Sequence, residues 1–211
     1  RGLGDVYKRQ LVGNLFTQFA SDASQVSGMV NFLNALLSAG CILFLFWSIT
    51  RLVRALLVGD ERKLSVMDVI IILGAGFVGA LAYTFSDTFW FSAVEGEVYA
   101  FSSFLTALVF WMILRWQDEA DSVSGDRWII LIAYIIGLSI GVHLLNLLCI
   151  PAIVLVFYYQ KYQTLSLKGV IGAIALSGIL IVLILFVYIP GMADVGAVSY
   201  THLRAHETSA H

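Results

Sequence analysis

Long apolar runs separated by short polar stretches constrain this chain more than any other feature of its sequence. A helix crosses the roughly 30 Å hydrocarbon core of a membrane with about 20 residues, because it rises about 1.5 Å per residue. Leu11 to Phe19 is interpreted as the end of a truncated helix. The sequence predicts an all-α fold, a polytopic transmembrane helical bundle. We expect six full spans: Val26 to Thr50, Met67 to Phe85, Val94 to Leu114, Trp128 to Val142, Leu144 to Tyr159, and Gly169 to Ile189.

The composition agrees with a membrane protein. Hydrophobic residues make up 60% of the chain and charged residues only 12%, with a mean hydropathy of +0.90. Soluble domains carry about twice that share of charge. The formal net charge of -2 shows no basic surplus, so we expect no nucleic-acid partner. Cys41 and Cys149 both lie inside apolar runs, which favours packing over a disulfide.

The two ends of the chain are expected not to be native. Asp5 to Gln10 and Val198 to Leu203 can be encoded by complementary copies of one transposase-type sequencing-adapter end. The alternative is that both are ordinary polar tails. We therefore predict adapter-derived tails at residues 1–10 and 198–211, and a native domain at residues 11–197.

Basic residues predict how the helices are oriented, because Lys and Arg remain on the cytoplasmic side of inserted helices. The basic residues of the native section fall in alternate loops: Arg51, Arg54, Arg62, Lys63, Arg115, Arg127, Lys161 and Lys168. The opposite loops hold only carboxylates: Asp22, Asp87, Glu95, Glu97 and Asp194. We therefore expect the first loop to lie outside. Acids near the basic residues are interpreted as solvated loop charges: Asp118, Glu119, Asp121 and Asp126.

The outer segment from Ser86 to Tyr99 is the first candidate for a functional surface. Glu97 lies eighteen residues before Arg115, about 27 Å along a helix, which places its carboxylate at the edge of the hydrocarbon. Charges at that depth usually face a partner or a cavity. The alternative is an interfacial aromatic belt with acids that favour a helix N-terminus. The segment combines carboxylates and aromatic rings: Asp87, Glu95, Glu97, Phe89, Trp90, Phe91 and Tyr99.

The second candidate is Gly137 to Asn146, where two apolar runs meet without a polar loop. We expect a tight turn, recessed from the outer surface, with His143 and Asn146 bordering a pocket. The alternative is that His143 caps a carbonyl group or lies in the headgroup layer. A single histidine does not specify a metal site, and we predict none.

Three other patterns are interpreted as packing features. Gly74 to Gly79 matches G-x-G-x-x-G, but it lies within an apolar run and lacks the strand-turn-helix setting of a dinucleotide site. Gly137 and Gly141 are expected to let helices approach closely. Asn31 and Asn34 share one helix face, where we expect hydrogen bonds to a neighbouring helix or to a ligand.

Three stretches carry a family resemblance: MVNFLNALLSAGCILFLFWSIT, SDTFWFSAVEGEVYAFSSFLTALVFW and DRWIILIAYIIGLSIGVHLLNLLCIPAIV. Together they resemble the bacterial membrane family called domain of unknown function 2723, common in Bacteroidetes. That family is similar to the protein O-mannosyltransferases of the glycosyltransferase-C architecture. The resemblance implies the bacterial inner membrane, with the reaction on its periplasmic face.

The resemblance also implies a reaction. A polyprenyl-phosphate sugar is the expected donor, and a protein or glycan hydroxyl is the acceptor. The principal acid of such enzymes follows the first helix, so we expect it upstream of this chain, which would be inactive alone. Pocket candidates within the matching stretches are Asp87, Glu95, Glu97, Tyr99, His143 and Asn146. No cofactor is evident, and a divalent metal stays undecided. The alternatives are a transporter or flippase of a lipid-linked or small polar substrate, and a non-catalytic scaffold.

Overall fold

The computed structural model describes residues 22–58, 63–94, 98–119, 125–162, 166–192, 194–195 and 198. Every regular element in these ranges is a helix, which confirms the predicted all-α class. The expected helix end at Leu11 to Phe19 and nearly all of both expected tails lie outside the described residues. The chain forms two compact units, Arg1–Cys149 and Ile150–His211.

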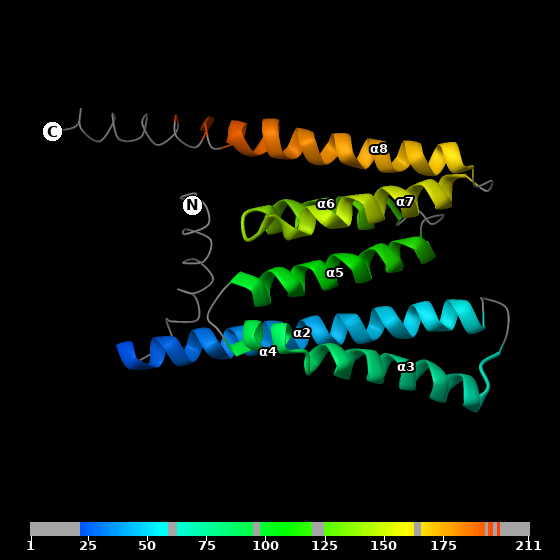
Figure 1. The fold of residues 1–211 in the computed structure, drawn as a ribbon, viewed down its shortest axis with the longest axis horizontal. Helices are drawn as coiled ribbons and strands as arrows, with labels where there is room; N and C mark the ends of the chain where they lie inside the picture. Colours follow the sequence, from blue (N-terminus) through cyan, green and yellow to red (C-terminus); the bar gives the residue numbers. More distant parts are fainter. Residues whose placement is uncertain are drawn as a thin grey trace. The chain divides into compact units, whose positions relative to one another are not determined.

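In the first unit, α3 runs antiparallel to α2 and α6 antiparallel to α5, whereas α2 and α5 run parallel (Figure 1). Helix α2 packs against α3 and α5, and α5 also packs against α6 (Figure 1). Its fully buried side chains include Val109 and Ile113 of α5 and Ile132 of α6, two helices that pack against each other. The elements of this unit are α2 (Ala23–Leu57), α3 (Val66–Thr84), α4 (Asp87–Val94), α5 (Val98–Glu119), α6 (Gly125–Ile140) and the 3-10 helix η1 (Leu144–Leu148).

The second unit contains α7 (Cys149–Lys161), α8 (Leu167–Leu183) and the π-helical turn η2 (Ile184–Tyr188). The connection between α7 and α8 is held locally. The Ser166 side chain accepts a hydrogen bond from the Gly169 amide at 3.0 Å and so caps α8. The Ser166 amide in turn donates to the Tyr158 hydroxyl at 3.4 Å.

Four helical stretches are long and apolar enough to cross a membrane: Gln25–Leu57, Val66–Thr84, Tyr99–Glu119 and Leu167–Met192. The other two expected spans are shorter apolar helices, Arg127–Ile140 and Asn146–Lys161. The transmembrane bundle is therefore confirmed, while the count of six spans stays a prediction. The predicted start of the third span was wrong, because Val94 ends the separate helix α4 and α5 begins only at Val98.

Alternation of the helices gives the first unit two distinct ends. The ends of α2 and α5 and the starts of α3 and α6 lie together and carry Arg51, Arg54, Arg115 and Arg127; we call this the arginine end (Figure 1). Helix α4, the start of α5 and the turn after α6 lie at the opposite end, which we call the Asp87 end. The predicted alternation holds for these residues. Arg62, Glu95 and Glu97 lie outside the described residues.

Glycines bring α2 and α3 into close contact. A Cβ atom at Gly76 would lie 3.0 Å from the Phe46 ring and even closer to the Thr50 methyl, and one at Gly79 would lie 2.6 Å from Ile49. Gly76 and Gly79 of the G-x-G-x-x-G pattern thus form a helix-packing surface, as expected, whereas Gly74 has no described atom within 4 Å of such a Cβ. At Gly137, likewise, no described atom lies within 4 Å of such a Cβ, so the predicted close approach there was wrong.

Helix α3 has a well-formed start. The Ser65 hydroxyl accepts a hydrogen bond from the Asp68 amide, and the Asp68 carboxylate accepts one from the Ser65 amide at 2.9 Å, which forms a capping box. Beyond this cap, most of the α3 surface is exposed and apolar, for example at Ile70 and Phe77. Exposed apolar side chains of this kind suit a lipid environment.

Candidate functional site

Tyr99 and His143 come together at the Asp87 end. Tyr99 lies in the first turn of α5, and His143 follows α6, so the two are 44 residues apart in the chain. Their ring centroids lie 5.7 Å apart at an interplanar angle of 55°. Tyr99 is 48% exposed, and His143 is half-buried. One aromatic face is therefore open for contact with another molecule.

The chain reverses immediately after α6, as predicted for this stretch. The amides of Val142 and His143 both donate to the Ser139 carbonyl, at 2.9 and 2.8 Å. The 3-10 helix Leu144–Leu148 then leads directly into α7. The reversal buries Asn146 completely, which positions its amide against the middle of α5.

Asn146 is the buried member of this group of residues and contacts α5. The Thr106 hydroxyl lies within hydrogen-bonding reach of the Asn146 Oδ1 and of the Ser102 carbonyl, the latter at 2.9 Å. Within the described part of the chain, neither the Asn146 Nδ2 nor the buried Ser102 hydroxyl has a hydrogen-bond partner. Two buried donors without acceptors are unfavourable, so each requires an acceptor such as a water molecule or a ligand oxygen.

Tyr99, Ser102 and Thr106 share one face of α5, because they are spaced three and four residues apart. With His143 and Asn146 they make up what we call the Tyr99–Asn146 cluster. Sequence reasoning found Tyr99, His143 and Asn146 but missed Ser102 and Thr106. The signal that could have identified them is the spacing of small polar residues on one face of an apolar helix.

The residues around this cluster match a known protein family. The family model for the protein O-mannosyl-transferase TMEM260 N-terminal domain matches residues 9–166. The chain belongs to this family. No curated protein and no solved structure matches the chain.

Membership of the TMEM260 family confirms the expected relation to protein O-mannosyltransferases. The matched residues include the whole Tyr99–Asn146 cluster and both ends of the first unit. The narrower resemblance to domain of unknown function 2723, and its bacterial source, stay predictions.

The outer carboxylates that the sequence suggested are not all placed with the cluster. Asp87 is exposed in the first turn of α4 and has no ion-pair or hydrogen-bond partner among the described residues. Helix α4 packs against α2 and α5. Glu95 and Glu97 belong to the part of the chain that the structure leaves undescribed, so their proximity to Tyr99 is a prediction.

The aromatic residues of α4 divide into two groups. Phe89 is buried, with its ring centroid 4.6 Å from that of Tyr83, and so holds α4 on the bundle. Trp90 and Phe91 are exposed, and Trp90 stacks on Phe85 at 6.4 Å. The exposed rings suit an interfacial belt, which was the alternative interpretation of this segment.

Among residues whose placement is described, no group of three or more His, Cys, Asp or Glu could hold a metal ion.

Proposed function

We propose that this chain is part of a membrane glycosyltransferase that moves a mannosyl or related hexosyl group from a polyprenyl-phosphate donor to a hydroxyl group of a protein or glycan. The TMEM260 family match carries the proposal. The Tyr99–Asn146 cluster supports it, because an open aromatic ring lies at the same end of the unit as two buried, unpaired donors.

The reaction assigned to this site is a single displacement. A carboxylate removes the proton of the acceptor hydroxyl, whose oxygen attacks the anomeric carbon. The bond from that carbon to the phosphate oxygen breaks, and polyprenyl phosphate leaves with the electron pair. Asp87, Glu95 and Glu97 are the candidate bases in this chain, and a further acid upstream is the principal one by analogy with glycosyltransferase-C enzymes.

The Tyr99–Asn146 cluster would bind the donor substrate rather than deprotonate the acceptor hydroxyl. The Tyr99 ring would stack on the sugar or the first isoprene unit, while Asn146 and Ser102 would donate to sugar or phosphate oxygens. His143, adjacent to Tyr99, would contact the phosphate. The reaction would take place at the Asp87 end, on the periplasmic face of the bacterial inner membrane, away from the arginines.

The test is transfer of radiolabelled mannose from polyprenyl phosphate to protein, in membranes of cells that express the complete gene. Tyr99→Ala should lower kcat/KM by about tenfold, which corresponds to about 1.4 kcal/mol of lost transition-state binding. Tyr134→Ala is the matched control, because Tyr134 is an exposed tyrosine in the middle of α6. Glu97→Gln should abolish most of the transfer if Glu97 is the base that deprotonates the acceptor, and should leave transfer unchanged if it is not.

Two results would end this proposal. The first is a wild-type protein that leaves acceptors unlabelled but moves the lipid-linked sugar across vesicles, which would establish the flippase alternative. The second is an equal loss of transfer in Tyr99→Ala and Tyr134→Ala, which would show that the cluster has no special role.

A further inference from the structure

The arginine end of the first unit has an open cavity of about 580 Å³ at its surface. That volume lies within the range of about 300–1,000 Å³ typical of small-molecule sites. Helices α2, α3, α5 and α6 all contribute to its wall. The lining includes three arginines and three tryptophans: Arg51, Arg54, Arg115, Trp47, Trp111 and Trp128.

The tryptophans form a continuous apolar wall. The Trp111 ring centroid lies 5.8 Å from that of Trp47 and 6.2 Å from that of Trp128. Phe44 extends this wall toward the centre of the bundle, with its ring centroid 5.3 Å from that of Trp111. Tryptophan is enriched where a membrane meets water, because its ring is apolar and its N–H is polar. The cavity therefore has a surface that suits the glycerol and upper acyl carbons of a lipid.

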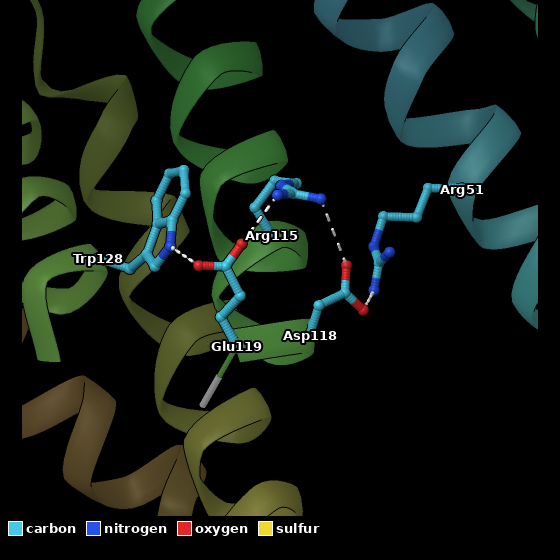
Figure 2. Close-up of polar contacts among 5 residues, drawn as sticks. All are labelled: Arg51, Arg115, Asp118, Glu119 and Trp128. Atoms are coloured by element: carbon cyan, nitrogen blue, oxygen red, sulfur yellow. Dashed lines mark hydrogen bonds and ion pairs between the residues drawn. The ribbon is translucent and has the colours of Figure 1, made fainter. Parts of the chain in front are cut away.

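Two carboxylates hold the polar side of the cavity in place (Figure 2). Glu119 accepts a hydrogen bond from Arg115 at 2.8 Å and another from the Trp128 indole at 2.9 Å. Asp118 pairs with Arg51 and lies 4.0 Å from Arg115. The interpretation of Asp118 and Glu119 as solvated loop charges was therefore wrong, because both lie in α5 and hold Arg51 of α2, Arg115 of α5 and Trp128 of α6.

Two of the three arginines that line the cavity are paired among the described residues. Asp118 pairs with Arg51, and Glu119 pairs with Arg115. Arg54 has no ion-pair partner in the described ranges. The Nε of Arg51 is buried and has no acceptor within those ranges either. Among the described residues, the cavity therefore offers an unpaired cation and an unsatisfied donor, and both suit an anionic, oxygen-rich group.

We propose that this arginine–tryptophan cavity binds the phosphate group of an anionic membrane lipid. Guanidinium groups match phosphate oxygens with paired hydrogen bonds, and basic pockets between membrane helices bind anionic headgroups. A free phosphate would use the arginines but leave the tryptophan wall uncovered, so the wall favours a lipid. The site lies at the end of the unit opposite the Tyr99–Asn146 cluster and does not depend on the transferase proposal.

The test uses the full chain in phosphatidylcholine vesicles that contain brominated phosphatidylglycerol or brominated phosphatidylcholine. Bromine quenches nearby tryptophans. With exposed Trp90 at the opposite end replaced by Phe and Trp116 buried, the titration measures how strongly each lipid occupies the wall of Trp47, Trp111 and Trp128. Wild type should prefer phosphatidylglycerol. Arg54→Gln should reduce that preference about tenfold, as expected for loss of one charge-assisted contact.

Arg127→Gln is the matched control, because it removes the same charge at the same end from a residue that does not line the cavity. It should leave the preference unchanged. Native mass spectrometry of the wild type gives an independent measurement, because phosphatidylglycerol should remain bound to it after purification. This measurement does not depend on whether Arg54→Gln folds.

Three results would overturn the proposal. In the first, both brominated lipids quench the tryptophan fluorescence of the wild type equally, and the purified wild type retains no phosphatidylglycerol. Arg54→Gln and Arg127→Gln could lose the preference equally, which would indicate only general attraction to a charged surface. Inorganic phosphate or glycerol 3-phosphate at matched ionic strength could displace the brominated lipid completely, which would assign the cavity to a soluble phosphate compound.

Discussion

Adding one methyl group at Gly76 tests the close packing of α2 against α3. The new Cβ would meet the Phe46 ring at 3.0 Å and the Thr50 methyl at a still shorter distance. The Thr50 methyl cannot easily rotate away, because the Thr50 hydroxyl donates to the Trp47 carbonyl at 2.9 Å. Gly76→Ala must therefore push the two helices apart or break that hydrogen bond.

The expected size of the effect follows from two opposing contributions. Overpacking a close contact costs about 1–3 kcal/mol, whereas alanine gains about 0.5–1 kcal/mol over glycine within a helix. Gly76→Ala should therefore lower the free energy of unfolding by about 1–2 kcal/mol. Gly74→Ala, two residues away with no described atom within 4 Å of the new methyl, should raise it by about 0.5–1 kcal/mol.

Unfolding in mixed micelles with increasing sodium dodecyl sulfate, followed by circular dichroism, measures both free energies. Adding Thr50→Ser to Gly76→Ala removes the clashing methyl but keeps the hydroxyl, and should restore about 1 kcal/mol. The Phe46 contact remains, so the recovery should be partial. Equal stability of the Gly76 and Gly74 variants, or no recovery in the double variant, would refute the packing argument.

Three further outcomes are expected. Glu119→Gln weakens one ion pair and one indole hydrogen bond that are both partly exposed, so the same unfolding titration should show a loss of about 1 kcal/mol; no loss would show that the network is dispensable. Thr106→Val removes the partner of the buried Asn146 Oδ1 and should cost about 1–3 kcal/mol. The loss should be smaller when Asn146→Leu is added, and additive losses in the double variant would contradict this. A maleimide applied outside intact cells should label Asp87→Cys but not Lys63→Cys, since both positions are exposed, and the reverse result would overturn the predicted orientation.

The helices were predictable because the bilayer imposes a length and a composition on anything that crosses it. The apolar runs therefore identified helical stretches, and the loop charges identified the two ends of the first unit. Helix α4 was missed because its eight residues, Asp87–Val94, are too short for a span and too aromatic to be recognised as an isolated helix. Its position depends on Phe89 packing against Tyr83, a tertiary contact.

The candidate site was predictable only in part. Tyr99, His143 and Asn146 were conspicuous because polar or aromatic residues at a helix boundary are uncommon in such a chain. The partner of Asn146 was not, since Thr106 lies 40 residues away and only the fold brings them together. The same holds for the Arg51–Asp118 pair, which joins positions 67 residues apart. Sequence spacing along one helix carries no information about contacts of this kind.

Helix α2 contains 35 residues and is about 52 Å long, whereas the 19-residue helix α3 is about 28 Å long. An upright α3 matches the hydrocarbon thickness, but even a tilt of about 40° leaves roughly 13 Å of α2 outside it. The polar residues Gln25, Ser27 and Asn31 lie in the first turns of α2, and Arg51 and Arg54 lie in its last two turns, so α2 extends beyond the hydrocarbon at both ends. Helix α4 packs against α2. At the Asp87 end, the N-terminal half of α2 and the short helix α4 therefore form a helical pair that a single hydrocarbon-length span would not provide.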